Sequence, residues 1–304
     1  MSRSTLAALG AVLVLLLGAV VWVGRARRPV KPEGTALSTV RADQIVQMGL
    51  AVNGATTTLK IIDGEWRIVT PFEDRANAEA MDRLVSVMKD VQVGTVISEN
   101  PARHAQFEVN DASATRLQVF VKGKDAPELD YWVGKEATDP ASCFVRVPGS
   151  NEVRTAEGLP ASLLLKSPEL FRSPDVSPIH PDLITALTVK GALELTVAND
   201  KGAWVNDVTK RIVAEELRHG IAAAMTAWRA ETYAVIVPTG QGFDKPFLTI
   251  EERAGERTAT IVVGGPATAV GHTARFVRSS DRPAILVVDD KLTQAVIEAL
   301  KKAQ

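Results

Sequence analysis

The sequence predicts an α+β protein in which an apolar leader precedes two tandem, related modules, each a mainly antiparallel sheet with packed helices. Three observations support this prediction. The leader is long and uncharged, the 304 residues suffice for two domains, and one order of elements occurs twice. DGEWRIVTPFEDRANAEAMDRLVSVMKD, from Asp63, and KGAWVNDVTKRIVAEELRHGIAAAMTAW, from Lys201, both place a tryptophan after a glycine turn and an amphipathic helix further on.

The apolar leader begins at Leu6 and ends at Gly24, and it carries no charge. Its length is close to the roughly 20 residues that a helix needs to cross a bilayer. We therefore expect a single transmembrane helix over residues 1–24, which anchors the chain in a membrane. A cleaved signal peptide is the alternative, although Arg25 falls inside the best match to a cleavage site. Residues 25–37 are basic and contain two prolines, which is typical of a tether.

The first module is expected over residues 38–172. Alternating apolar and polar residues on both sides of Asp63-Gly64 predict a β-hairpin, with Trp66 as a core anchor. A helix with Asn77 as its N-cap should follow. Its apolar stripe has helical spacing and consists of Met81, Leu84, Val85 and Met88. Further strands are expected from Thr115, Glu128 and Cys143 and around Val153, and a short helix from Leu159.

A junction over residues 173–181 is expected to separate the modules, because the segment from Ser167 to Pro181 holds four prolines in fifteen positions. The second module, residues 182–304, repeats the order of the first. Lys201-Gly202 makes the turn before Trp204, and a final helix is capped by Asp289-Asp290. The apolar stripe of its first helix is Leu217, Ile221, Ala224 and Trp228.

Five pairs of residues occupy matching places in the two modules. They are Trp66 with Trp204, Met81 with Leu217, Phe107 with Phe243, Gly134 with Gly264, and Phe144 with Phe276. The five residues follow one another in the same order in both modules, and each copy is long enough to be a domain. We interpret the tryptophans, phenylalanines and glycines of these pairs as structural landmarks of a duplicated module.

These landmarks carry a family resemblance. The Gly-x-Trp turn, the amphipathic helix and the step GFDKPFLTIEE from Gly242 resemble a bacterial family named domain of unknown function 4340. The likeness runs from about Val40 to about Leu300, although the first copy reads QFEVNDASATRLQVF at the middle step. The resemblance implies a membrane anchor and no established catalytic residues. It also implies a link to ABC-type transporters of the gliding-motility kind, beside whose subunits some members are encoded.

The resemblance and the leader together predict a single-pass protein of the bacterial inner membrane. The side that holds the body is open, because the basic residues after the anchor favour the cytoplasm, whereas a very short tail carrying Arg3 is typical of an export signal. We favour an extracytoplasmic body. The formal net charge of -1 gives no attraction to nucleic acid.

Residues that could carry chemistry are scattered along the chain, so we expect no enzyme, cofactor or metal. The four histidines stand singly at His104, His180, His219 and His272. Glu215 lies one helical turn before His219. We expect both side chains to lie on a solvated helix face, and the alternative is that the two bind a metal ion together. Cys143 is the sole cysteine, which excludes an intrachain disulfide and predicts a small buried residue. The glycine-rich stretch VVGGPATAVGH, from Val262, is expected to be a turn, because it lacks the ending of a phosphate-binding loop.

Arg146 and Arg278 occupy matching strands in the two modules. They are either two ordinary strand arginines or a pair that binds an anion across the junction. The anchor, the duplicated module and the lack of a convergent catalytic set in the sequence favour a non-enzymatic, membrane-anchored accessory or scaffold protein that contacts an ABC-type transporter or an envelope assembly. The alternative function is an extracytoplasmic ligand-binding protein with its site in a cleft between the modules.

Overall fold

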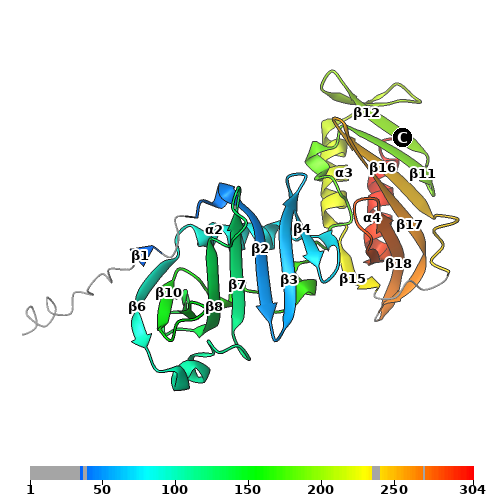
Figure 1. Cartoon of the computed structure of the whole chain (residues 1–304). Helices are drawn as coiled ribbons and strands as arrows, with labels where there is room; N and C mark the ends of the chain where they lie inside the picture. Colours follow the sequence, from blue (N-terminus) through cyan, green and yellow to red (C-terminus); the bar gives the residue numbers. More distant parts are fainter. Residues whose placement is uncertain (1–34, 37–39, 235–239, 270) are drawn as a thin grey trace, which may run out of the picture.

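The computed structural model describes residues 35–36, 40–234, 240–269 and 271–304. The expected anchor and nearly all of the expected tether lie outside these residues. Within the described part of the chain, no helix is both long and apolar enough to cross a membrane. The described residues form two modules that stand side by side, each built on its own sheet (Figure 1).

The first module contains a ten-stranded sheet in which every neighbouring pair is antiparallel. Its strands are β1 (Thr35–Ala36), β2 (Ile45–Val52), β3 (Ala55–Ile62), β4 (Glu65–Thr70), β5 (Asp74–Arg75), β6 (Gln92–Ser98), β7 (Thr115–Val121), β8 (Leu129–Glu136), β9 (Ser142–Arg146) and β10 (Val153–Glu157). They lie in the order β1-β6-β10-β9-β8-β7-β2-β3-β4-β5.

The second module contains a nine-stranded antiparallel sheet. Its strands are β11 (Ala186–Gly191), β12 (Leu195–Asp200), β13 (Ala203–Asn206), β14 (Ile212–Val213), β15 (Ala230–Ala234), β16 (Leu248–Ala254), β17 (Arg257–Ala269), β18 (His272–Ser279) and β19 (Ile285–Asp289). They lie in the order β14-β13-β12-β11-β16-β17-β18-β19-β15.

The two strand orders are the same once β1 is set aside. Read from β5, the first sheet runs β5-β4-β3-β2-β7-β8-β9-β10-β6, and each position corresponds to the strand at the same place in the second sheet. Trp66 and Trp204 are both the second residue of their strands, β4 and β13. The Asp63-Gly64 and Lys201-Gly202 turns before them have positive φ at both residues, as a two-residue hairpin loop requires. The sequence-based prediction of two related α+β modules is consistent with this topology.

One face of each sheet is covered by helices. These are α2 (Ala78–Met88) in the first module, and α3 (Glu215–Ala227) and α4 (Asp290–Lys301) in the second. Met81, Leu84 and Met88 of α2 are buried in the first core, and the Asn77 side chain accepts a hydrogen bond from the amide of Ala80. In α3 the buried stripe is Ile221, Ala222 and Met225. The expected stripe faces the core, since Leu217 and Ala224 are partly buried against it and Trp228, just after the helix, is fully buried.

Gly134 and Gly264 sit at matching positions where a backbone carbonyl approaches the sheet. A Cβ atom at Gly134 would lie 2.1 Å from the carbonyl oxygen of Phe107, and one at Gly264 would lie 2.2 Å from that of Gln241. In both strands the register shifts just beyond the glycine. The expected turn over VVGGPATAVGH is therefore wrong, because β17 continues as an irregular strand to Ala269.

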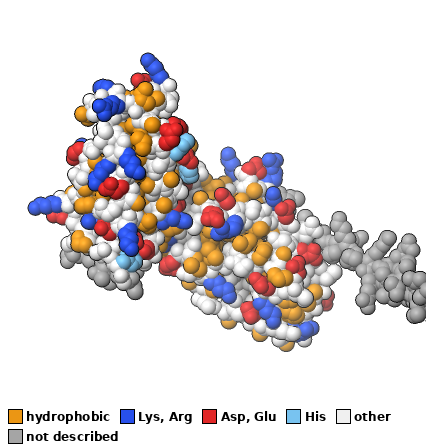
Figure 2. Space-filling view, turned by 180° about the vertical axis from the view of Figure 1, so that it is seen from behind, with side chains coloured by type: hydrophobic (Ala, Val, Ile, Leu, Met, Phe, Trp, Pro, Cys, Tyr) orange, Lys and Arg blue, Asp and Glu red, His pale blue; other side chains and the backbone are white. Residues whose placement is uncertain are grey.

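Several elements were not predicted from the sequence. Strands β2, β6 and β15 lack a clear alternating pattern, and the helix expected from Leu159 is a three-residue 3-10 turn, Ala161–Leu163. On the face shown in Figure 2, acidic and basic side chains are interspersed over both lobes. This arrangement agrees with a net charge close to zero.

Candidate functional site

The segment that connects the modules, residues 171–181, is hydrogen-bonded to both of them. Asn77 donates its amide hydrogen to the carbonyl of Phe171 at 2.7 Å, so the start of the segment lies against the end of β5. Three residues after Phe171, the carbonyl of Pro174 accepts a hydrogen bond from the amide of Ala230 in β15, also at 2.7 Å. Two isolated β-bridges also connect the segment to both modules: Arg172 pairs with Ala76 of the first module, and Asp175 pairs with Arg229 of the second. The segment therefore joins the β5 edge of one sheet to the β15 edge of the other.

Asp74 is the centre of a buried charge cluster at this junction. Its side chain has no exposure, and its two oxygens accept hydrogen bonds at 2.6 Å from different arginines. Arg172 comes from the connecting segment, and Arg282 comes from the loop between β18 and β19 of the second module. Arg282 is also fully buried, and its guanidinium donates to the carbonyl of Ser173. One carboxylate thus ties together three parts of the chain.

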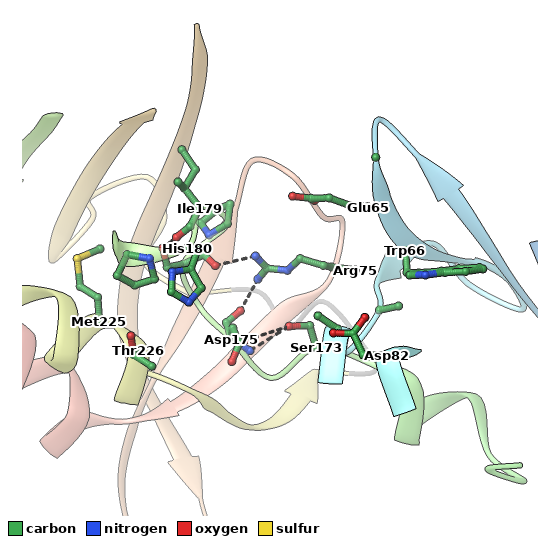
Figure 3. A pocket seen from close by; sticks show the side chains of 16 residues that line it. Glu65, Trp66, Arg75, Asp82, Ser173, Asp175, Ile179, His180, Met225 and Thr226 are labelled. Carbon is green, nitrogen blue, oxygen red and sulfur yellow. Dashed lines mark hydrogen bonds between the residues drawn. The ribbon is translucent and has the colours of Figure 1, made fainter. Parts of the chain in front are cut away.

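Arg75, the neighbour of Asp74, extends the cluster on the other side of the strand. Its guanidinium donates to the carbonyls of Ser177 and Asp175 in the connecting segment (Figure 3). Its Nε lies 3.6 Å from a carboxylate oxygen of Asp281, in the same loop as Arg282. Burial lowers the pKa of Arg75 below its ordinary value, while Asp281 counteracts the shift. These contacts make Arg75 a bridge between the first module and the other two parts.

Glu252 is a second fully buried carboxyl group at the junction, contributed by β16. The Ser177 hydroxyl lies 2.7 and 2.9 Å from its two oxygens, and the amide of Ile179 donates to it at 3.3 Å. Burial raises the pKa of Glu252 to about 7, against the opposing effect of these hydrogen bonds. The adjacent Glu251 is exposed, because successive side chains of a strand point to opposite faces of the sheet.

A cleft of about 390 Å³ lies beside this cluster, between the modules. Trp66 and Ile179 provide apolar lining, and Met225 lies on the side of the second module (Figure 3). Glu65, Asp82, Asp175 and His180 are polar members of the lining. Both terminal nitrogens of Arg75 are already bonded to carbonyls. The lining therefore suits an apolar or positively charged ligand better than an anion.

The structure does not bring Arg146 and Arg278 together. Arg146 is buried in its own module, where it donates to the carbonyl of Val109 at 3.0 Å and to the carboxylate of Asp111. Arg278 is exposed on the second module, with its guanidinium 4.9 Å from the Phe243 ring centroid. Phe107, the counterpart of Phe243, packs its ring 4.8 Å from that of Phe144. The two arginines thus have different local environments.

The other predicted residues are placed as follows. Cys143 is fully buried, and burial raises the pKa of its thiol to about 12, which leaves no reactive thiolate at neutral pH. His219 Nε2 lies 3.2 Å from a carboxylate oxygen of Glu215, and both side chains are exposed on the face of α3. His180 is exposed at the cleft, 3.8 Å from Asp182.

One group of side chains in the described residues could hold a metal ion, and its members are far apart in the sequence. Glu231, His272 and Asp289 each offer a ligand atom, and these atoms all lie within 4.8 Å of one another. Sequence spacing gave no sign of the group, because three strands bring it together. The same holds for Asp74 and Arg282, which are separated by 208 positions.

The family model described as Domain of unknown function (DUF4340) matches residues 66–234. This range covers more than half of the chain. The chain belongs to the DUF4340 family. No curated protein and no solved structure was found to match the chain. In this DUF4340 protein the matched range begins at Trp66 and ends with β15, so it includes Asp74, Arg75 and the whole connecting segment. It is narrower than the resemblance seen in the sequence, and Glu252 and Arg282 lie outside it.

Proposed function

We propose that this DUF4340 protein is a non-enzymatic, membrane-anchored scaffold that acts through contacts with other proteins. The observation that carries the proposal is the position of Asp74, which is buried between an arginine of the connecting segment and an arginine of the second module. Modules joined by a linker alone would be expected to move relative to each other. Here a change of orientation must break several directional hydrogen bonds at once, so the two modules offer partners one fixed surface.

The proposed partner is an integral membrane protein, with an ABC-type transporter as the class that the family resemblance suggests. The proposed location is the bacterial inner membrane, with the anchor at residues 6–24 and the body on the extracytoplasmic side. A reporter fused to the C-terminus tests the location, because it should be active only when the body has been exported.

Photo-crosslinking in native membranes tests the function. We would place a crosslinkable residue at exposed positions of both modules, such as Lys122, Val208 and Ile212. From each of these positions, the otherwise wild-type protein should crosslink to the same integral membrane protein. The crosslinked product should be lost when Asp74→Asn loosens the junction. Failure to trap any membrane protein from either module would overturn the proposal, and so would an unchanged yield in the loosened variant.

The cleft supports a second candidate, a binding protein for a positively charged ligand with an apolar part. Trp66 and the carboxylates of the lining are the observation that favours it. Spermidine and a short arginine-containing peptide should raise the melting temperature, whereas ATP should not. Asp82→Asn should reduce the shift, since Asp82 is exposed in the cleft. Equal responses to cations and to ATP would count against this function.

A further inference from the structure

We propose that Glu231, His272 and Asp289 form a binding site for a divalent transition-metal ion on the second module. The proposal goes beyond the scaffold function, which needs no metal. The three donors are two carboxylates and one imidazole, and their ligand atoms lie within 4.8 Å of one another. Carboxylate and imidazole together are ligands of Zn²⁺ and its neighbours in the first transition row.

Three adjacent strands place the donors at one end of the sheet. Strands β18, β19 and β15 lie side by side, and Asp289 at the end of β19 is paired with Ala274 of β18. His272 lies two residues before Ala274, at the start of β18. On the other side of β19, the pairing with β15 shifts register between Ala230 and Thr232, and Glu231 is the residue at this bulge. A bulge redirects a side chain relative to the regular pleat.

Two contacts of the group are compatible with a bound metal. The imidazole Nε2 of His272 lies 2.8 Å from a carboxylate oxygen of Glu231. One oxygen of Asp289 accepts the amide hydrogen of Lys291 and so caps α4, and a carboxylate has a second oxygen for a metal. Zinc ligands lie about 2.0–2.2 Å from the ion, so donors of a tetrahedral site are roughly 3.4 Å apart. All three side chains are at least partly exposed, so small rotations can close the present spacing.

The first module provides an internal comparison, because it has the same topology. There, Ser142 pairs with Glu157 as Ala274 pairs with Asp289. The residue of the first module that matches His272 is therefore Pro140. The residue that matches Glu231 is Gly94, because Val93 and Ala230 occupy matching positions and are followed by Gly94 and Glu231. Proline and glycine have no ligating side chain. The fold therefore does not require an imidazole and a carboxylate at these positions, and their presence in the second copy calls for another explanation.

Isothermal titration of the full-length protein in detergent, after treatment with a chelator, tests the proposal. One Zn²⁺ should bind per chain, and Co²⁺ should give the visible absorption of a nitrogen and oxygen site. His272→Gln and Glu231→Gln should each weaken Zn²⁺ binding by more than about tenfold, a loss at least as large as that from removing an outer-shell partner. Ca²⁺ should bind poorly, because it prefers oxygen ligands.

The matched control is His219→Gln, which removes a second exposed histidine that is paired with a glutamate, at 3.2 Å. It should leave Zn²⁺ binding unchanged. Circular dichroism establishes that each variant is folded. The proposal is overturned if the folded wild-type protein takes up no Zn²⁺, or if His219→Gln reduces the affinity as much as His272→Gln does.

Discussion

The carboxyl group of Glu252 lies fully buried between the second sheet and the connecting segment. Burial opposes the charged form, whereas the Ser177 hydroxyl and the Ile179 amide favour it, and burial is the larger effect. Arg75 also favours the charged form and Asp281 opposes it. The resulting pKa of about 7 lies above the ordinary value of 4.5, so the folded protein retains this proton where an unfolded chain has released it.

Glu252 should therefore make the protein less stable as the pH rises. Its favourable contribution is complete below about pH 4.5 and is lost as the pH rises through about 7. One pKa unit corresponds to about 1.4 kcal/mol. Relative to Glu252→Gln, which cannot ionise, the wild-type protein should thus lose about 1–3 kcal/mol between pH 5 and pH 8.

Urea denaturation of both proteins at the two pH values measures this difference. Glu251→Gln is the matched control, because the adjacent Glu251 is exposed and should give a difference independent of pH. A constant difference between wild type and Glu252→Gln across the range would contradict the assignment.

At the scale of elements, each sheet contains one glycine that allows a backbone carbonyl from outside the strand to approach closely. Gly134 in β8 lies under the carbonyl of Phe107, and Gly264 in β17 lies under that of Gln241. A methyl group at either position would clash with backbone, which cannot rotate away as a side chain can. The duplicated module therefore needs glycine here for close approach, and the register shift beside each glycine belongs to the same feature.

Gly264→Ala should destabilise the protein by about 1–3 kcal/mol, as overpacking of a closed site does. Gly134→Ala should have a similar effect. Gly220→Ala is the control, because Gly220 lies in α3 and an added Cβ would meet no atom within 4 Å apart from the adjacent backbone of its own helix. Alanine is favoured over glycine in a helix by up to about 1 kcal/mol, so this variant should be more stable than wild type. Chemical denaturation compares the three variants, and equal effects at Gly264 and Gly220 would refute the close-approach argument.

At the scale of the whole molecule, the two modules are joined through buried charges and backbone hydrogen bonds. Arg172 adds contact with the Tyr233 ring, whose centroid lies 3.7 Å from its guanidinium, and the Tyr233 hydroxyl donates to the carbonyl of Ser173. Such a junction should transmit unfolding from one module to the other. The described residues are thus expected to melt as a single cooperative unit.

Asp74→Asn should uncouple the modules, because it leaves the buried charges of Arg172 and Arg282 without their counterion. Breaking a buried pair in this way costs about 3–5 kcal/mol. Scanning calorimetry should show one transition for the wild-type protein and two for the variant. Glu65→Gln is the control, since the exposed Glu65–Arg257 pair should contribute at most about 1 kcal/mol. A single unshifted transition in Asp74→Asn would show that the cluster does not couple the modules.

The sequence by itself determined the duplicated α+β plan, the paired tryptophans and glycines, and the caps of α2 and α4. These features depend on turn residues and on apolar spacing between near neighbours, which one stretch of sequence displays completely. The tertiary structure alone decided that Asp74 meets Arg282, that Glu252 meets Ser177, and that Glu231, His272 and Asp289 converge. Such contacts join positions far apart in the chain, and burial, rather than residue type, fixes how strongly their charges interact.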